Sequence, residues 1–265
     1  MRILAIDTST RAMGLALYQF DEKDPEGPLK GRFEGVEIDK EGANPSDEFF
    51  FHLEKLGRKA DLNLRQEGMI DAYAVALGPG SFTGLRIGVT TAKTLAQFTA
   101  RPLVGISTLE AMAWGWGRED LVHVPLIDAR ANRIYGAVYA LPKEGLGQSS
   151  DCSKGKEKTE LISLVPEDLY YEEDFLPQLE KAVKKAGLKG ILYIGQGLSA
   201  HPVLEETSLL FEIAQGDNAL SPVRGVAILA AQKIIRGKTD SFLDLAPRYF
   251  RKSQAEMDRE RCGKS

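Results

Sequence analysis

Residues 74–98 read AVALGPGSFTGLRIGVTTAKTLAQF, and this stretch decides the fold. A short apolar run over residues 72–77 has the length of a buried strand and ends in a glycine-proline-glycine turn. Ser81 or Thr83 can then cap a helix that runs to about Gln97. A strand, a glycine loop and a helix N-terminus together present backbone N–H groups to a phosphate. The first hypothesis is therefore a nucleotide-binding loop.

The sequence patterns of known nucleotide loops do not fit this stretch. The pattern GxxxxGK[ST] requires lysine after its last glycine, but Leu85 follows Gly84 here. The dinucleotide pattern GxGxxG begins with Gly78 and Gly80, but Thr83 stands where the third glycine belongs. Only a generic anion site remains open for this loop.

A row of small residues runs along the expected helix. Gly84, Gly88, Ala92 and Ala96 are spaced four residues apart, so they share one helix face. Each glycine inside a helix costs about 1 kcal/mol relative to alanine, so a close contact should compensate. This face either packs inside the same chain or forms a docking face for another subunit.

Composition describes an ordinary soluble globular protein. The chain has 265 residues, enough for two lobes, with 43% apolar and 27% charged residues. A net charge of −4 gives no overall attraction to nucleic acid or to an anionic membrane. Cys152 and Cys262 form no CxxC pair, and the first apolar run is too short for a signal peptide. We expect a reduced, cytoplasmic protein without a membrane partner.

The order of the expected elements repeats along the chain. The first unit has strands over residues 3–6, 14–19, 32–38 and 72–77, with helices that begin at Pro45 and near Gly84. The second has strands over residues 121–127, 134–141, 161–165 and 190–194, with helices over 173–186 and 222–235. Residues 108–116 should form a helix between the lobes. The polar residues 142–160 should form a mobile insertion.

Each unit therefore reads βββαβα. A duplicated βββαβα unit is the two-lobed α/β architecture of actin, hexokinase and the heat-shock ATPases, with RNase H-like lobes and a nucleotide cleft between them. We expect an N-terminal lobe over residues 1–104 that docks a partner, and a C-terminal lobe over residues 105–265.

Four sequence motifs resemble one family throughout the chain. They are ILAIDTST from Ile3, GPGSFTGLRIG from Gly78, IDAR from Ile127 with Tyr135 behind it, and APRYFR from Ala246. The chain resembles the TsaB (YeaZ) family, the bacterial partner proteins in threonylcarbamoyladenosine synthesis on tRNA. The glycine motif is the most specific of the four, and together they extend from the N-terminus to Arg251.

This resemblance implies a non-catalytic scaffold. In the family, ATP and metal belong to a paralogue, TsaD, on which TsaB docks through N-lobe helices, and a small ATPase, TsaE, completes the assembly. It implies no tightly bound cofactor, contact with tRNA through the complex, modification at adenosine 37 of ANN-decoding tRNAs, and a homodimer when the chain is alone. The expected partner-binding residues are Gly84, Arg86, Gly88, Thr91, Ala92 and Leu95.

One position departs from the family pattern. Family members often carry a histidine followed by Ser or Thr at the start of the first N-lobe helix, where Pro45-Ser46 stands here. No metal function can be assigned to that position in this chain.

Asp7, Asp128 and Arg130 are the candidate cleft residues. In active ATPases of this fold a glycine-containing turn follows the first aspartate, whereas Thr8 and Ser9 follow Asp7, and their side chains would crowd a phosphate. Asp7 could hold hydrated Mg²⁺, but capping its own turn is the favoured interpretation. Asp128 and Arg130 could bind a ligand, partner or tRNA, or form a local ion pair, which is the simpler reading.

Other activities fit the sequence less well. The main alternative is an ATP-dependent small-molecule kinase of the same fold. His52, His123 and His201 each lack a second histidine at ligand spacing, which argues against a metallopeptidase, and His52 and His123 are expected to be packing or core residues. Ser81 directly follows Gly80, so it does not match the nucleophile turn GxSxG. The basic C-terminal tail is interrupted by acidic residues and is a weak candidate for RNA binding.

Overall fold

A computed structural model describes residues 1–24, 30–40, 45–63, 68–142 and 161–250 of the chain. Most of the expected insertion, residues 143–160, and the basic tail beyond Phe250 lie outside the described residues. Within the described ranges, no helix combines the length and the apolar composition that a membrane crossing requires.

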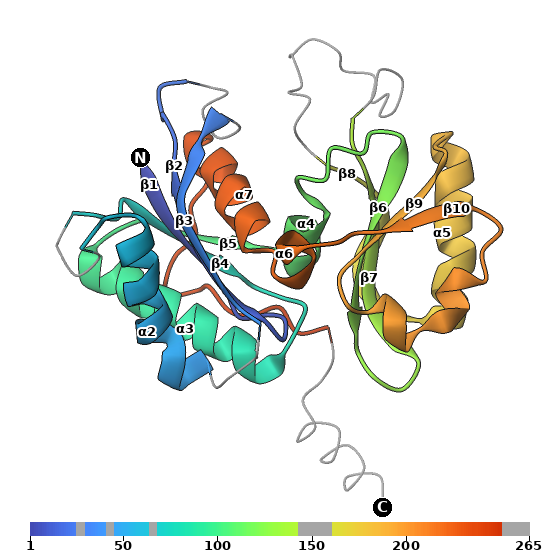
Figure 1. Cartoon of the computed structure of the whole chain (residues 1–265), viewed down its shortest axis with the longest axis horizontal. Helices are drawn as coiled ribbons and strands as arrows, with labels where there is room; N and C mark the ends of the chain where they lie inside the picture. Colours follow the sequence, from blue (N-terminus) through green and yellow to red (C-terminus); the bar gives the residue numbers. More distant parts are fainter. Residues whose placement is uncertain (25–29, 41–44, 64–67, 143–160, 251–265) are drawn as a thin grey trace, which may run out of the picture.

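Two five-stranded sheets form the two halves of the molecule (Figure 1). The first sheet has the order β3-β2-β1-β4-β5, and the second has the order β10-β9-β6-β7-β8. The first strands are β1 (Arg2–Asp7), β2 (Met13–Gln19), β3 (Arg32–Asp39), β4 (Ala72–Ala76) and β5 (Leu103–Ile106). The second set is β6 (Leu121–Asp128), β7 (Arg133–Ala140), β8 (Ile162–Tyr171), β9 (Gly190–Ile194) and β10 (Leu210–Ile213).

The two sheets share one topology, which confirms the predicted duplication. In each, the first strand pairs antiparallel with the second and parallel with the fourth, as β1 does with β2 and β4, and β6 with β7 and β9. The short turn after Asp7 accounts for the first antiparallel pair. The long excursion through a helix before β4 permits the parallel pair.

Helices cover both faces of the first sheet because its strand residues alternate between two cores. Leu4 and Ile6 point to the side covered by α2 (Pro45–Lys59) and α3 (Phe82–Thr99). Ile3 and Ala5 point to the opposite side, where α7 (Val223–Ile235) packs (Figure 1).

Helix α7 corrects the lobe boundary predicted from sequence, which assigned residues 105–265 to the second lobe. Its buried apolar residues form one core with strands of the first sheet, so the chain returns to the first lobe after β10. The alanines of that sheet face, among them Ala16 and Ala74, leave room for a largely apolar helix. Helix α4 (Thr108–Ala113) contacts both α7 and β6, which confirms the expected helix between the lobes.

The second half also differs in detail from the predicted elements. Strand β8 continues through Pro166 to Tyr171, beyond the expected end at residue 165, because an edge strand tolerates proline. Helix α5 (Glu172–Ala186) ends at Gly187, which adopts the left-handed conformation with φ of 62°. The sequence did not predict β10, or the short helices η1 (Leu198–Ala200), η2 (Pro202–Glu205) and α6 (Asp217–Leu220).

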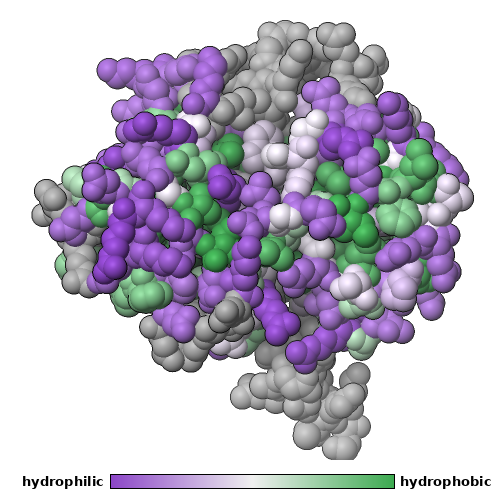
Figure 2. Space-filling view, in the orientation of Figure 1, coloured by the Kyte–Doolittle hydropathy of each residue, from purple (hydrophilic) through white to green (hydrophobic). Residues whose placement is uncertain are grey.

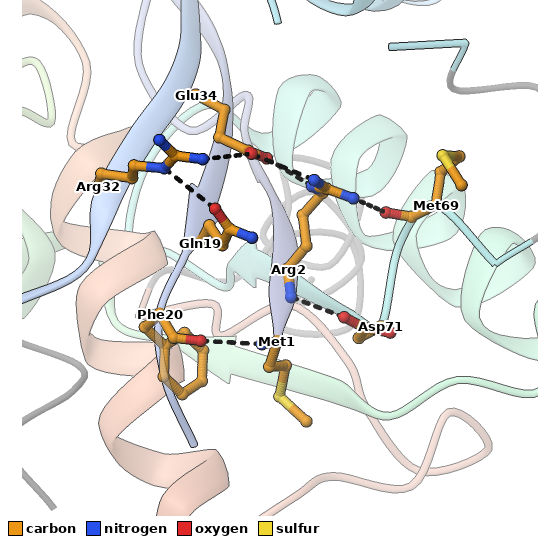
Figure 3. A network of polar contacts seen from close by, with 8 residues as sticks. All are labelled: Met1, Arg2, Gln19, Phe20, Arg32, Glu34, Met69 and Asp71. Carbon is orange, nitrogen blue, oxygen red and sulfur yellow. Dashed lines mark hydrogen bonds and ion pairs between the residues drawn. The ribbon is translucent and has the colours of Figure 1, made fainter. Parts of the chain in front are cut away.

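A polar network fastens the start of β1 (Figure 3). The Arg2 guanidinium forms a two-pronged ion pair with Glu34 and donates to the carbonyl oxygen of Met69 at 3.1 Å. Its backbone N–H donates to Asp71 at 2.7 Å. The Arg2 and Glu34 side chains are only 19% and 11% exposed, so this pair is largely desolvated. Arg32 also approaches Glu34 at 3.6 Å, but it is 75% exposed.

We expect Arg2→Met to lower the free energy of unfolding by about 1–3 kcal/mol, because Glu34 loses its buried partner. Arg32→Met is the matched control and should change stability by less than about 0.5 kcal/mol, because exposed ion pairs contribute little. Urea unfolding of both variants measures the difference. Equal losses would contradict the assignment of the stabilising role to Arg2.

Candidate functional site

The carboxylate of Asp7 is buried at the end of β1, and hydrogen bonds hold both of its oxygens. One oxygen accepts from the backbone N–H of Ser9 at 3.0 Å and from the Ser9 hydroxyl. The other accepts from the hydroxyl of Ser221 at 2.7 Å. Asp7 therefore caps its own turn, which is the interpretation favoured from sequence, and Ser221 is a partner that the sequence did not indicate.

The turn after Asp7 lies against the N-terminus of α3. The backbone N–H of Ser81 donates to the carbonyl oxygen of Ser9 at 2.7 Å, and the Thr8 hydroxyl donates to the carbonyl oxygen of Gly84 at 2.6 Å. The Ser81 hydroxyl accepts from the Gly84 N–H at 3.2 Å, which confirms the predicted helix cap. These N–H groups of the glycine loop are bonded within the chain, so they do not form the open anion cradle of a phosphate loop.

The small-residue face of α3 is buried by the same turn. A Cβ atom at Gly84 would lie 2.0 Å from the carbonyl oxygen of Thr8, and one at Gly88 would lie 2.2 Å from the Thr8 hydroxyl. Ala92 and Ala96 are buried in the core between α3 and the sheet. The face therefore packs inside the chain, so Gly84, Gly88 and Ala92 are not available as partner-binding residues.

The opposite face of α3 is the exposed one. Of the expected partner-binding residues, Arg86 is exposed, while Thr91 and Leu95 are partly exposed. Phe98 on the last turn is 91% exposed. Helix α2 beside it carries Phe50 and Phe51, which are 65% and 63% exposed. We call these six residues the outer helical face; Figure 1 shows α2 and α3 together on the outside of the first half.

The C-terminal segment borders the start of α3. The backbone N–H of Arg248 donates to the carbonyl oxygen of Leu77 at 2.7 Å. Arg86 lies 4.1 Å from the centre of the Phe82 ring and donates to the Tyr249 hydroxyl at 3.2 Å. The described part of the APRYFR motif, which ends at Phe250, thus lies against the glycine motif.

The second turn, after β6, is built differently from the expected ion pair. Asp128 accepts from the backbone N–H of Arg130 at 2.7 Å and contacts Nε2 of His201 at 3.2 Å. Nδ1 of the same imidazole contacts Glu172. Asp128 thus pairs with His201 and not with the side chain of Arg130. Nothing in the sequence indicated this pair, because the two carboxylates that contact His201 are 73 and 29 residues away from it along the chain. Arg130 follows in the left-handed region, with φ of 62°, and its side chain is exposed.

A further polar group joins the two halves and was also missed from sequence. The Ser107 and Tyr139 hydroxyls both donate to one oxygen of Glu167. Burial, together with the charge and hydrogen bond of Glu167, raises the pKa of Tyr139 well above its usual range, so the phenol remains a donor. Buried His123 lies 2.8 and 3.1 Å from the carbonyl oxygens of Ala113 and Arg118, as expected for a core residue.

Space-filling colours show no single dominant apolar surface on the face seen in Figure 2, where hydrophobic groups on both halves lie among hydrophilic side chains. The residues described above form a candidate site with two parts of different character. One is the closed turn at Asp7, and the other is the outer helical face.

Two lobes of the same topology, each with an aspartate turn after its first strand, define the fold class that includes actin, hexokinase and the heat-shock ATPases. The family model described as "TsaD: tRNA N6-adenosine threonylcarbamoyltransferase" matches residues 51–258. The chain is 30% identical to "tRNA threonylcarbamoyladenosine biosynthesis protein TsaB" of Escherichia coli K12, with 96% of each chain covered. It is also 30% identical to the Bacillus subtilis protein of the same name, covering 79% of this chain and 77% of that one.

A solved structure shares the fold. "YeaZ from Pseudomonas aeruginosa" has a TM-score of 0.67 and 22% identity, covering 94% of this chain and 99% of that one. The chain belongs to the TsaB family.

Because the small-residue face of α3 is packed inside the chain, larger side chains on that face should destabilise the isolated chain. Gly88→Ala should lower the free energy of unfolding by about 1–3 kcal/mol, because its methyl group meets the Thr8 hydroxyl. Thr8→Ala removes that hydroxyl, so Gly88→Ala should cost less in this background, with a coupling of at least about 1 kcal/mol by double-mutant cycle. Gly84→Ala should not be rescued, because it meets a backbone oxygen. If Gly88→Ala leaves the isolated chain unchanged, the packing assignment is wrong.

Burial raises the pKa of Asp7 above its ordinary value, although hydrogen bonds from Ser9 and Ser221 oppose this. The folded state therefore binds a proton to Asp7 more tightly than the unfolded chain, and stability from this group is lost as pH rises from about 4. The free energy of unfolding of Asp7→Asn, measured relative to that of the unmodified chain, should therefore increase as the pH rises. Chemical unfolding of both proteins between about pH 4 and pH 8 tests the sign, and the opposite trend would show that hydrogen bonding outweighs burial.

Proposed function

We propose that the chain is a non-catalytic scaffold subunit in threonylcarbamoyladenosine biosynthesis. On this proposal it heterodimerises with a TsaD-like paralogue and supports threonylcarbamoyl transfer to adenosine 37 of ANN-decoding tRNAs. The observation that carries the proposal is the 30% identity, over 96% of the chain, to a protein named for this pathway.

The closed turn at Asp7 supports the non-catalytic part of the proposal. An ATPase of this fold needs backbone N–H groups open to phosphates at its first turn. Here the Ser9 backbone and Thr8 side chain lie directly against the start of α3, and Asp7 has its two oxygens engaged by Ser9 and Ser221. We therefore assign ATP and Mg²⁺ to the partner subunits and no tightly bound cofactor to this chain.

The outer helical face supports the docking part. Phe98, Phe50 and Phe51 expose aromatic rings on adjacent helices, and aromatic residues are enriched in protein interfaces. Arg86 adds a charged group whose orientation is set by Phe82 and Tyr249. This face replaces the small-residue face as the proposed contact with TsaD.

The match to a TsaD family model suggests that chain and partner share a fold. Two similar chains can pair through equivalent faces with approximate two-fold symmetry. The same face would then form a homodimer when the chain is alone and yield to the paralogue when it is present. A TsaE-like ATPase completes the proposed cytoplasmic complex, and tRNA meets the chain through that complex.

Phe98→Asp should weaken binding to the TsaD-like paralogue at least tenfold, because it places a charge in an apolar contact. Leu210→Asp is the matched control, since Leu210 is 75% exposed but lies on β10 in the other half. Calorimetric titration of each variant with the purified paralogue measures affinity. Formation of the modified nucleoside by the reconstituted complex measures function.

Unchanged affinity of the Phe98→Asp chain would place the interface elsewhere. Turnover of ATP with Mg²⁺ by the isolated chain would overturn the non-catalytic assignment and favour a small-molecule kinase of this fold.

A further inference from the structure

We propose that Asp39, Glu48 and His52 bind a first-row divalent transition metal ion of the zinc type. The three residues join the end of β3 to α2, and β2 lies between β3 and the strand that ends at Asp7. The proposal is independent of the proposed function.

Three potential ligand atoms converge at this point. Nε2 of His52 lies 3.5 Å from a carboxylate oxygen of Glu48 and 4.0 Å from one of Asp39, and all three atoms lie within 4.8 Å of one another. In a tetrahedral zinc site with bonds of roughly 2.0–2.2 Å, neighbouring ligand atoms are about 3.4 Å apart. The Glu48 side chain is 44% exposed, so its carboxylate can close the remaining gap by a change of rotamer.

Glu37 orients the histidine for this role. Its carboxylate lies 3.3 Å from Nδ1 of His52, on the side of the ring away from the proposed ion. With Nδ1 in contact with Glu37, the other ring nitrogen, Nε2, faces Asp39 and Glu48. This carboxylate–histidine–metal arrangement is common in zinc sites.

His201 also lies between two carboxylates, but its arrangement could not hold a metal ion between them. Its two carboxylates, Glu172 and Asp128, contact different ring nitrogens and so lie on opposite sides of the imidazole. At His52, by contrast, two carboxylates face the same nitrogen. Helical spacing reinforces the pair, because residues i and i+4 such as Glu48 and His52 share one face.

The donor set selects the ion. One imidazole nitrogen and two carboxylates suit zinc and neighbouring transition metals, whereas Mg²⁺ prefers oxygen ligands throughout and retains its water. Three protein ligands leave a fourth position for water. Such an ion would tie the first turns of α2 to the sheet, and those turns carry Phe50 and Phe51 of the outer helical face.

Titration of the full chain, after removal of metals with EDTA, tests the site. We expect one equivalent of Zn²⁺ to bind by calorimetry, and one equivalent of Co²⁺ to give a visible absorption spectrum. His52→Gln and Glu48→Gln should each weaken Zn²⁺ binding at least tenfold. Glu54→Gln is the matched control on the same helix, two residues from His52 and so on a different face, and should bind as the unmodified chain does. Mg²⁺ should not compete.

The competing arrangement is a His52 that contacts the two carboxylates directly and binds no ion. Lack of saturable Zn²⁺ binding, or equal binding by all variants, would favour that arrangement and overturn the proposal. His52 is buried, so its replacement can unfold the chain; thermal unfolding monitors this. Glu48→Gln, at an exposed side chain, then decides the outcome.

Discussion

The close approach of the Asp7–Ser9 turn to α3 is the constraint on which the rest of the first lobe depends. The carbonyl oxygen of Thr8 occupies the space that a side chain at Gly84 would need, and its hydroxyl does the same at Gly88. Glycine at both positions lets backbone contact backbone, and the hydrogen bonds of Thr8 and Ser9 then hold the helix in place. About 1 kcal/mol of helix propensity lost at each glycine is offset by this contact.

That contact also determines which side of α3 faces outward. With Gly84 and Gly88 against the Thr8 turn and Ala92 against the sheet, helical periodicity directs the larger side chains of α3 outward or to the border of the contact. The small residues set the depth and rotation of the helix that carries the outer helical face, so they would contribute to the proposed docking only indirectly. In the proposed complex the partner would contact the large side chains, whose positions depend on the small ones behind them.

Local patterns in the sequence were sufficient for most of the fold. Strand runs, the Ser81 cap and Gly187 mark element boundaries that depend on neighbouring residues, and the repeated order of elements indicated the duplication. Contacts between distant residues were not predictable in this way. Ser221 reaches Asp7 across 214 positions and His201 reaches Asp128 across 73, without a motif that links them. The same limit explains why α7 was assigned to the wrong lobe, since its apolar surface is compatible with either sheet.

The turn at Asp7 shows how one fold can serve either nucleotide chemistry or docking. A glycine turn leaves the helix N-terminus open, and its partial positive charge then attracts phosphate. Thr8 and Ser9 close the same space and supply hydroxyl and carbonyl groups that bond to Asp7 and α3. A buried carboxylate that would otherwise need a cation obtains hydrogen bonds from Ser9 and Ser221 instead. Internal hydrogen bonds thus take the place of phosphate contacts and fix α3 against the turn without a ligand, and such preorganisation would favour the docking proposed above.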